Sequence, residues 1–95
     1  MATYVFSGQG VQTLTARTTH LFIDVLVLGT GYSTGLAIPV NYFHIGLFRL
    51  GINGYFFPVI PLDAFRQVIL VPDRCDQIGY YLSTTTSVQV VEDNL

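Results

Sequence analysis

The sequence contains no lysine and no tryptophan, and it has few charges of either sign. Only 11% of its 95 residues are charged, whereas about a quarter are charged in an ordinary soluble domain. The basic residues are four arginines spread singly along the chain, and the net charge is −2. A nucleic-acid-binding protein needs a basic patch that displaces counterions from the phosphates. We therefore expect neither DNA nor RNA as a partner.

Cysteine is equally scarce. The single Cys75 excludes an internal disulfide framework, and it excludes a metal site built from several cysteines. The N-terminal segment MATYVFSGQG has neither the basic region nor the long apolar core of a signal peptide. We therefore expect a protein that is made in a reducing cytoplasm and is not secreted by a signal peptide.

Hydrophobic runs of membrane-spanning length without helix breakers are also missing, although 51% of the residues are hydrophobic. Residues 36–62 carry one full charge, at Arg49. The helix breakers of that segment are Pro39, Gly46, Gly51, Gly54, Pro58 and Pro61. A membrane-spanning helix must satisfy its backbone hydrogen bonds internally, and repeated breakers make that costly. We expect strands here and no membrane span.

What the sequence does contain is a series of short runs rich in Val, Ile, Thr, Tyr and Phe, divided by Gly, Pro, Asn, Asp and Ser clusters. Helical spacing of apolar residues is not sustained, and only a single helical turn is expected, at residues 61–64. About eight strands are expected: 3–6, 11–17, 20–28, one bent or two separate strands within 36–50, 55–60, 66–71, 77–82 and 88–92. The pattern predicts one compact all-β domain over residues 1–95, either a β-sandwich or jelly roll or a small barrel.

The dipeptide Asn53-Gly54 is the clearest local signal. Asn and Gly tolerate the two positive φ angles of a type I′ turn. We therefore predict a two-residue hairpin flanked by Ile52 and Tyr55.

The segment GTGYSTG, residues 29–35, matches the G-x-S-x-G nucleophile elbow around Ser33. In an α/β-hydrolase the acid and then the histidine follow the serine, whereas here His44 precedes every later acid, the first of which is Asp63. A dinucleotide-binding loop fails too, because Arg49 stands where an acidic residue is needed. Neither signature is followed by a helical pattern. We interpret the segment as a turn without chemistry.

A cysteine nucleophile would have to combine Cys75 with His20 or His44 and with Asp24. Nothing in the sequence indicates that these residues converge. We expect no catalytic residue, and we expect the protein not to be an enzyme.

Two carboxylates, Asp73 and Asp76, flank Arg74. They lack the spacing of a calcium loop, and the arginine opposes cation binding. We expect no metal and no cofactor.

Adjacent aromatic residues occur in Tyr42-Phe43, Tyr55-Phe56-Phe57 and Tyr80-Tyr81. Successive strand residues point to opposite faces, so one member of each pair is expected in the core and the other outside. Scattered exposed aromatics are normal in monomers. Aromatic enrichment with little Lys and Glu, however, is also the composition of subunit interfaces, and tyrosines can stack on sugars.

The apolar segment 47–60 is the candidate interface. Its candidate contact residues are Phe48, Tyr55, Phe56 and Phe57, and only one of Phe56 and Phe57 is expected in the core. These residues lead us to predict self-association.

The short lysine-free chain, the Thr-rich segments VQTLTARTT and STTTSVQVVED, and the Gly-rich turns resemble the small all-β virion proteins of tailed bacteriophages, among them capsid decoration or cement proteins. The resemblance implies a non-enzymatic subunit of a virion that stabilises a symmetric assembly. Its partners would be further copies of itself and a larger shell or tail protein. No functional residue transfers from it. The alternative is a small carbohydrate-binding, lectin-like module.

Overall fold

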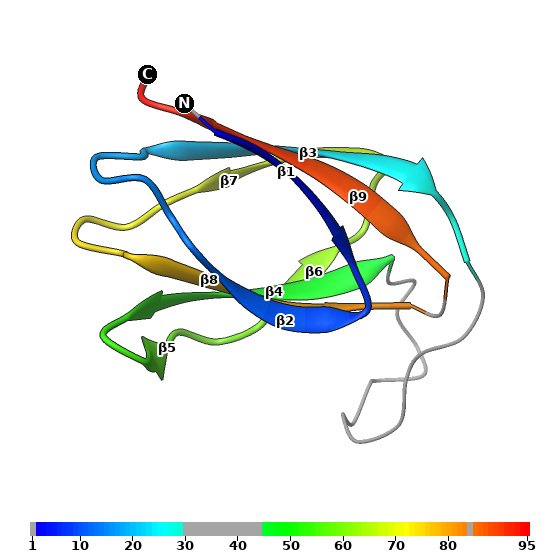
Figure 1. Ribbon diagram of the computed structural model, residues 1–95, viewed down its shortest axis with the longest axis horizontal. Helices are drawn as coiled ribbons and strands as arrows, with labels where there is room; N and C mark the ends of the chain where they lie inside the picture. Colours follow the sequence, from blue (N-terminus) through cyan, green and yellow to red (C-terminus); the bar gives the residue numbers. More distant parts are fainter. Residues whose placement is uncertain (1, 30–44, 84) are drawn as a thin grey trace.

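The computed structural model describes residues 2–29, 45–83 and 85–95, and these residues form nine β-strands and no helix (Figure 1). The strands are β1 (Thr3–Ser7), β2 (Gln9–Thr13), β3 (His20–Val27), β4 (Gly46–Ile52), β5 (Tyr55–Phe56), β6 (Ile60–Leu62), β7 (Arg66–Leu70), β8 (Gln77–Leu82) and β9 (Ser87–Asp93). Ser33, His44 and the Tyr42-Phe43 pair lie outside the described residues. The predicted all-β class is confirmed.

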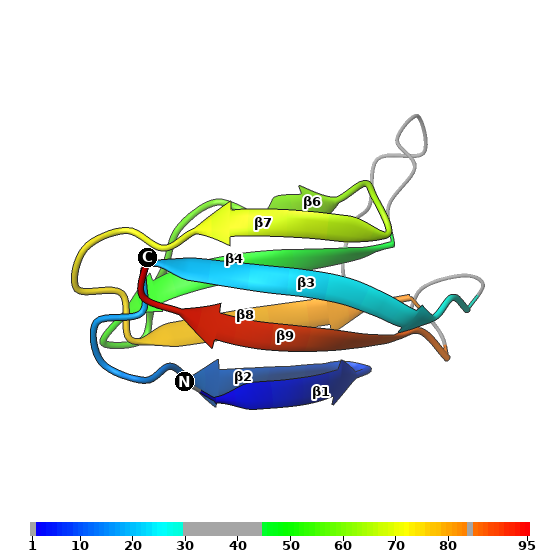
Figure 2. The ribbon, with the colours of Figure 1, turned by 90° about the horizontal axis from the view of Figure 1, so that it is seen from above.

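The strands form two antiparallel sheets that lie face to face. One sheet has four strands in the order β1-β9-β3-β7, and the other has the order β2-β8-β4-β5, with β6 also paired to β4. Figure 1 shows the four-stranded sheet above the five-stranded one, and Figure 2 shows that their strands are roughly aligned. The molecule is therefore a β-sandwich, and the alternative of a closed barrel is not formed.

The strand pairs are nested along the chain. β1 pairs with β9, β2 with β8, β3 with β7, and β4 with β6. The first half of the chain thus pairs with the second half in reverse order, as in one long hairpin rolled into two sheets. This is the strand order of a jelly roll.

Alternating side chains from both sheets fill the space between them. In β9 the buried positions are Val88, Val90 and Glu92, while the residues between them are partly exposed. The apolar core consists of Phe6, Leu14, Leu21, Ile23, Ile45, Phe48, Leu50, Leu62, Ile69, Ile78, Leu82, Val88 and Val90. Each fully buried Leu, Ile, Val or Phe contributes about 1.5–3 kcal/mol to the free energy of unfolding.

An aromatic stack packs where β1 lies beside β8. The chain passes from β1 into β2, and so from one sheet to the other, through Gly8, whose φ is 68°. The Phe6 ring stacks on Tyr80 with 4.1 Å between centroids and on Tyr4 with 5.7 Å. Gly10 pairs with Tyr80, and a Cβ there would lie 2.8 Å from Tyr80 Cζ, so only glycine leaves room for the ring.

The predicted type I′ turn is present. Asn53 and Gly54 have φ angles of 52° and 85°, and Ile52 pairs with Tyr55 across the turn. The Asn53 N–H donates to the Asp76 carboxylate at 3.1 Å, which ties the turn to the loop before β8.

Two expected elements were wrong in this region. The expected strand 55–60 is divided into β5 and β6, because Pro58 has no N–H for a ladder. Residues 61–64 do not form a helical turn. Instead Pro61 lies in β6 and pairs with Leu47 of β4, and Leu62 is fully buried in the core.

The strand expected at 11–17 is observed as β2, which covers Gln9–Thr13. It begins two residues earlier and ends four residues earlier than predicted. The chain leaves the sheet after Thr13, where the Thr15 N–H donates to both oxygens of the Glu92 carboxylate at 3.2 Å. The buried Glu92 side chain thus satisfies this backbone N–H.

Candidate functional site

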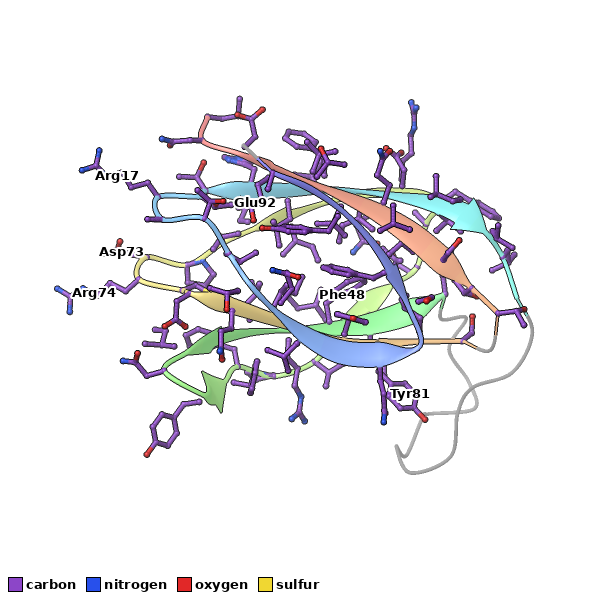
Figure 3. The ribbon with its side chains drawn as sticks, in the orientation of Figure 1. Arg17, Phe48, Asp73, Arg74, Tyr81 and Glu92 are labelled. Carbon is purple, nitrogen blue, oxygen red and sulfur yellow. The ribbon has the colours of Figure 1, made fainter. Side chains whose placement is uncertain are left out.

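Phe48 was predicted as an interface residue, and this prediction is wrong because Phe48 lies in the core. It is fully buried, and Figure 3 shows its ring between the two sheets. The reason is its register on the central strand β4, where it pairs with Tyr80 and Ile60. Tyr80 also packs against the core, so both side chains point inward.

The expectation that one of Phe56 and Phe57 belongs to the core is also wrong. Their exposed fractions are 36% and 40%, and neither is part of the core. β5 is only two residues long and lies at the edge of its sheet, so the alternation of faces is not continued past Phe56. Tyr55, beside the turn, is 83% exposed. These three residues lie on the surface, and their role as contact residues stays a prediction.

Phe56 lies across two glycines of the neighbouring strands. A Cβ built on Gly51 would lie 2.8 Å from Phe56 Cδ1, and one on Gly79 would lie 3.3 Å from Phe56 Cε1. The ring therefore lies over the backbone of both glycines. It forms one wall of a groove.

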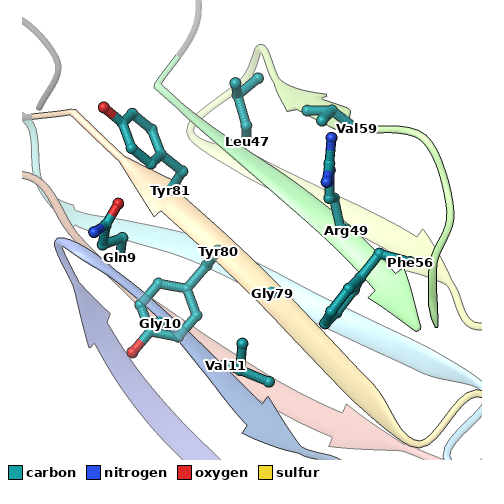
Figure 4. Close-up of a pocket in the computed structure, with 10 residues that line it drawn as sticks. All are labelled: Gln9, Gly10, Val11, Leu47, Arg49, Phe56, Val59, Gly79, Tyr80 and Tyr81. Atoms are coloured by element: carbon teal, nitrogen blue, oxygen red, sulfur yellow. The ribbon is translucent and has the colours of Figure 1, made fainter. Parts of the chain in front are cut away.

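This groove runs over the outer face of the five-stranded sheet and has a volume of about 420 Å³ (Figure 4). Its lining residues are Gln9, Gly10, Val11, Leu47, Arg49, Phe56, Val59, Gly79, Tyr80 and Tyr81. Cross-strand register brings them together from β2, β8 and β4: Gln9, Tyr81 and Leu47 form one row, and Val11, Gly79 and Arg49 the next. Gly79 has no side chain, and the Phe56 ring occupies the space that a Cβ there would enter.

Arg49 carries the only full charge among these ten residues. Arg49 is exposed, and no acidic residue lines the groove. Over the described parts of the chain, the ion pair that the structure contains joins Arg66 to Asp24 at 2.9 Å, on the opposite sheet. The groove thus combines aromatic walls, an amide and one guanidinium.

A second surface lies on the outer face of the four-stranded sheet. Val68, Phe22 and Val91 are direct cross-strand neighbours on β7, β3 and β9, and we name them the apolar row. Val68 is 51% exposed, and the adjacent Leu70 is 70% exposed.

Polar groups flank the apolar row on both sides. The Asp24–Arg66 ion pair lies on one side. On the other side His20 pairs with Asp93, and the His20 ring stacks on Phe22 with 6.3 Å between centroids. An apolar centre with a polar rim is the arrangement of a protein–protein contact.

The candidate catalytic residues are each engaged elsewhere. Cys75 Sγ donates to the Gln77 carbonyl at 3.4 Å, His20 Nδ1 is 2.8 Å from Thr19 Oγ1, and Asp24 pairs with Arg66. Burial raises the pKa of the Cys75 thiol, which disfavours the nucleophilic thiolate. The described residues therefore present no cysteine–histidine–aspartate system.

Asp76 was considered as a metal ligand together with Asp73, but in the structure it makes hydrogen bonds that link three segments of the chain. Its carboxylate accepts from the Asn53 N–H, its N–H donates to the Gly51 carbonyl, and its carbonyl accepts from the Leu14 N–H. Asp73 and Arg74 point outward at the end of the sandwich (Figure 3). Within the described ranges no three His, Cys, Asp or Glu residues gather as a metal site.

Sequence reasoning missed Gln9, Arg49 and Tyr81 as neighbours, and it missed the apolar row. Their residue types carry no motif, and they come from strands that are distant in sequence. The alternation in HLFIDVLV and RQVIL could have indicated an apolar outer face, because Phe22 and Val68 occupy outward positions.

Comparisons with protein-family models, with curated proteins and with solved structures found no match. In residues 2–29, 45–83 and 85–95 no helix has the length and hydropathy needed to cross a membrane. The fold itself defines the class as an all-β sandwich with jelly-roll strand order.

Proposed function

We propose that this protein is a non-enzymatic structural subunit of a viral particle, a capsid decoration or cement protein or another accessory subunit of the head or tail. It stabilises the assembly through protein–protein contacts with its own copies and with a larger shell or tail protein. The observation that supports this proposal is the apolar row, Val68, Phe22 and Val91, with its polar rim.

The fold is compatible with this function without selecting it. Jelly rolls occur in viral capsid domains and also in lectin domains, and function is carried by surfaces rather than by folds. The surface favours assembly, since contiguous apolar side chains rimmed by polar groups mark interaction sites. Single exposed apolar residues would carry no such meaning.

The test is a charge placed in the apolar row. Val68→Lys changes a half-exposed residue on the edge strand β7, so folding is retained while a lysine enters the contact. We expect association to weaken about 30-fold, the effect of losing an interface hot spot. Light-scattering mass is measured at matched concentrations, with and without any shell protein that co-purifies.

The matched control is Thr13→Lys, which adds the same charge at an exposed position of the five-stranded sheet. It should associate like the wild type. A wild-type chain that stays monomeric and binds no shell protein would overturn the proposal.

The second candidate function is that of a small carbohydrate-binding module, and the groove with Phe56 and Tyr81 at its walls favours it. Its volume lies in the range of small-molecule sites, about 300–1,000 Å³. A monomer that binds glycans and no shell protein would support this candidate over the first.

A further inference from the structure

The groove on the outer face of the five-stranded sheet has a charge opposite in sign to that of the whole chain. Arg49 is its one charged residue, whereas the chain has a net charge of −2. The acidic residue nearest in register to this face, Asp76, is engaged by the Asn53 N–H at 3.1 Å. An anionic group is therefore attracted to the groove.

A single carboxylate fits this charge better than a phosphate. One guanidinium offers a planar fork that binds one carboxylate through two parallel hydrogen bonds. Phosphate sites add backbone N–H groups at helix N-termini or in nests. Here the backbones of β8 and β4 are paired in the ladder on two sides, and the backbone of β2 is paired on the side of β8.

The other walls suit a sugar ring. The aromatic face of Phe56 can pack against the C–H groups of a pyranose, and the Gln9 amide can both donate to and accept from its hydroxyls. Gly79 has no side chain of its own, and Phe56 Cε1 lies 3.3 Å from the position that a Cβ would take there, so a sugar ring at this point meets the Phe56 ring (Figure 4). The volume of about 420 Å³ is that of a small-molecule site.

An extended peptide fits less well. Peptides that bind sheets gain most from main-chain hydrogen bonds to an unpaired edge strand. The groove instead lies over the face of the sheet, across β2, β8 and β4. The free edge of β2 directs its hydrogen-bonding groups along the plane of the sheet and not into the groove.

We propose that this groove binds a carboxylate-bearing pyranose, a uronic or sialic acid residue of a glycan, with Arg49 holding the carboxylate, Phe56 packing against the ring and Gln9 bonding its hydroxyls. The inference rests on the second candidate function. It does not depend on the apolar row, which lies on the opposite sheet.

The experiment titrates the protein with glucuronic acid and with N-acetylneuraminic acid, and with glucose as the neutral counterpart, while backbone amide NMR shifts are followed. Both acids are expected to shift Gly79 and its neighbours, and glucose is expected to bind more weakly. Arg49→Gln should weaken binding of the acids about tenfold and leave glucose unchanged, because one charge-assisted pair is lost. Arg49→Lys should restore only part of the affinity, since the fork is absent.

The matched control is Arg66→Gln, which removes the same charge from the opposite sheet and should leave sugar binding unchanged. Absence of shifts at the groove with both acids would overturn the proposal. Equal binding of acids and glucose by the wild type, or an acidic peptide binding through Arg49 where the sugars do not, would overturn it too. None of these outcomes bears on the oligomeric mass, so the virion proposal is judged separately.

Discussion

At the scale of residues, Glu92 is the unusual group of the interior. It is a carboxylate only 2% exposed, and it accepts from the Thr15 N–H at 3.2 Å and from Thr18 Oγ1 at 3.3 Å. Burial alone would raise its pKa, but hydrogen bonds from Thr15, Tyr4 and Thr18 outweigh that effect, so the pKa of Glu92 is lowered. The hydrogen bond between Tyr4 and Glu92 is also the chief reason that the pKa of Tyr4 is raised. The charged carboxylate fastens the chain between β2 and β3 to β9.

A carboxyl with a lowered pKa in the folded state stabilises the fold above its unfolded pKa of about 4.3. That contribution is lost as the pH falls through the folded pKa. Glu92→Gln should lower the free energy of unfolding by about 2 kcal/mol at pH 7, since charged hydrogen bonds to a buried group are lost. When the pH is lowered from the unfolded pKa through the folded pKa of Glu92, the variant should also lose less stability than the wild type. Urea unfolding at several pH values measures both effects.

Asp63→Asn is the control for this prediction, because it removes a carboxylate from an exposed position. It should behave like the wild type at neutral pH. If Glu92→Gln is as stable as the wild type at pH 7, the carboxylate does not hold the loop.

At the scale of elements, the hairpin of β4 and β5 depends on its turn. Gly54 has a φ of 85°, which a β-branched residue adopts only with strain. Gly54→Val should destabilise the domain by about 1 kcal/mol or more, and the melting temperature should fall by about 5 °C. Asn53→Gly keeps a residue that tolerates positive φ, so its effect should be small. An unchanged melting temperature for Gly54→Val would contradict the role given to the turn.

The length of an element depended on its neighbours as much as on its own residues. The segment 55–60 has the composition of one strand, yet β5 ends at Phe56 and β6 begins at Ile60, because Pro58 between them has no N–H to donate. β2 ends at Thr13, although the apolar and Thr-rich pattern continues. Beyond it the Leu14 N–H donates to the Asp76 carbonyl and the Thr15 N–H donates to the Glu92 carboxylate. Such endings depend on groups that are up to 77 residues away in sequence.

At the scale of the whole molecule, the two broad faces of the sandwich differ. The four-stranded sheet exposes the apolar row, and the five-stranded sheet exposes the groove around Arg49. A protein can therefore contact its own copies or a shell through one face and leave the other face open to a ligand.

Self-association through the apolar row predicts a melting temperature that depends on concentration. Partner binding stabilises only the folded chain, so a higher protein concentration should raise the melting temperature by mass action. The wild type should gain a few degrees over a hundredfold range, and Val68→Lys should gain less. Differential scanning calorimetry over this range is the measurement. A wild-type melting temperature that is independent of concentration would argue against a self-associating subunit.

Local chemistry was enough to determine the all-β class and the type I′ turn, and it left a sandwich or jelly roll and a small barrel as alternatives. β-branched and aromatic runs favour strands wherever they occur, and Asn53-Gly54 can adopt its two positive φ angles without help from the rest of the chain. Tertiary structure alone decided that Phe48 is buried and that Phe56 and Phe57 both lie outside. It also decided that Gln9, Arg49 and Tyr81 share one groove. The reason is cross-strand register, because the neighbours of a strand residue are set by pairing between distant segments, which no local pattern specifies.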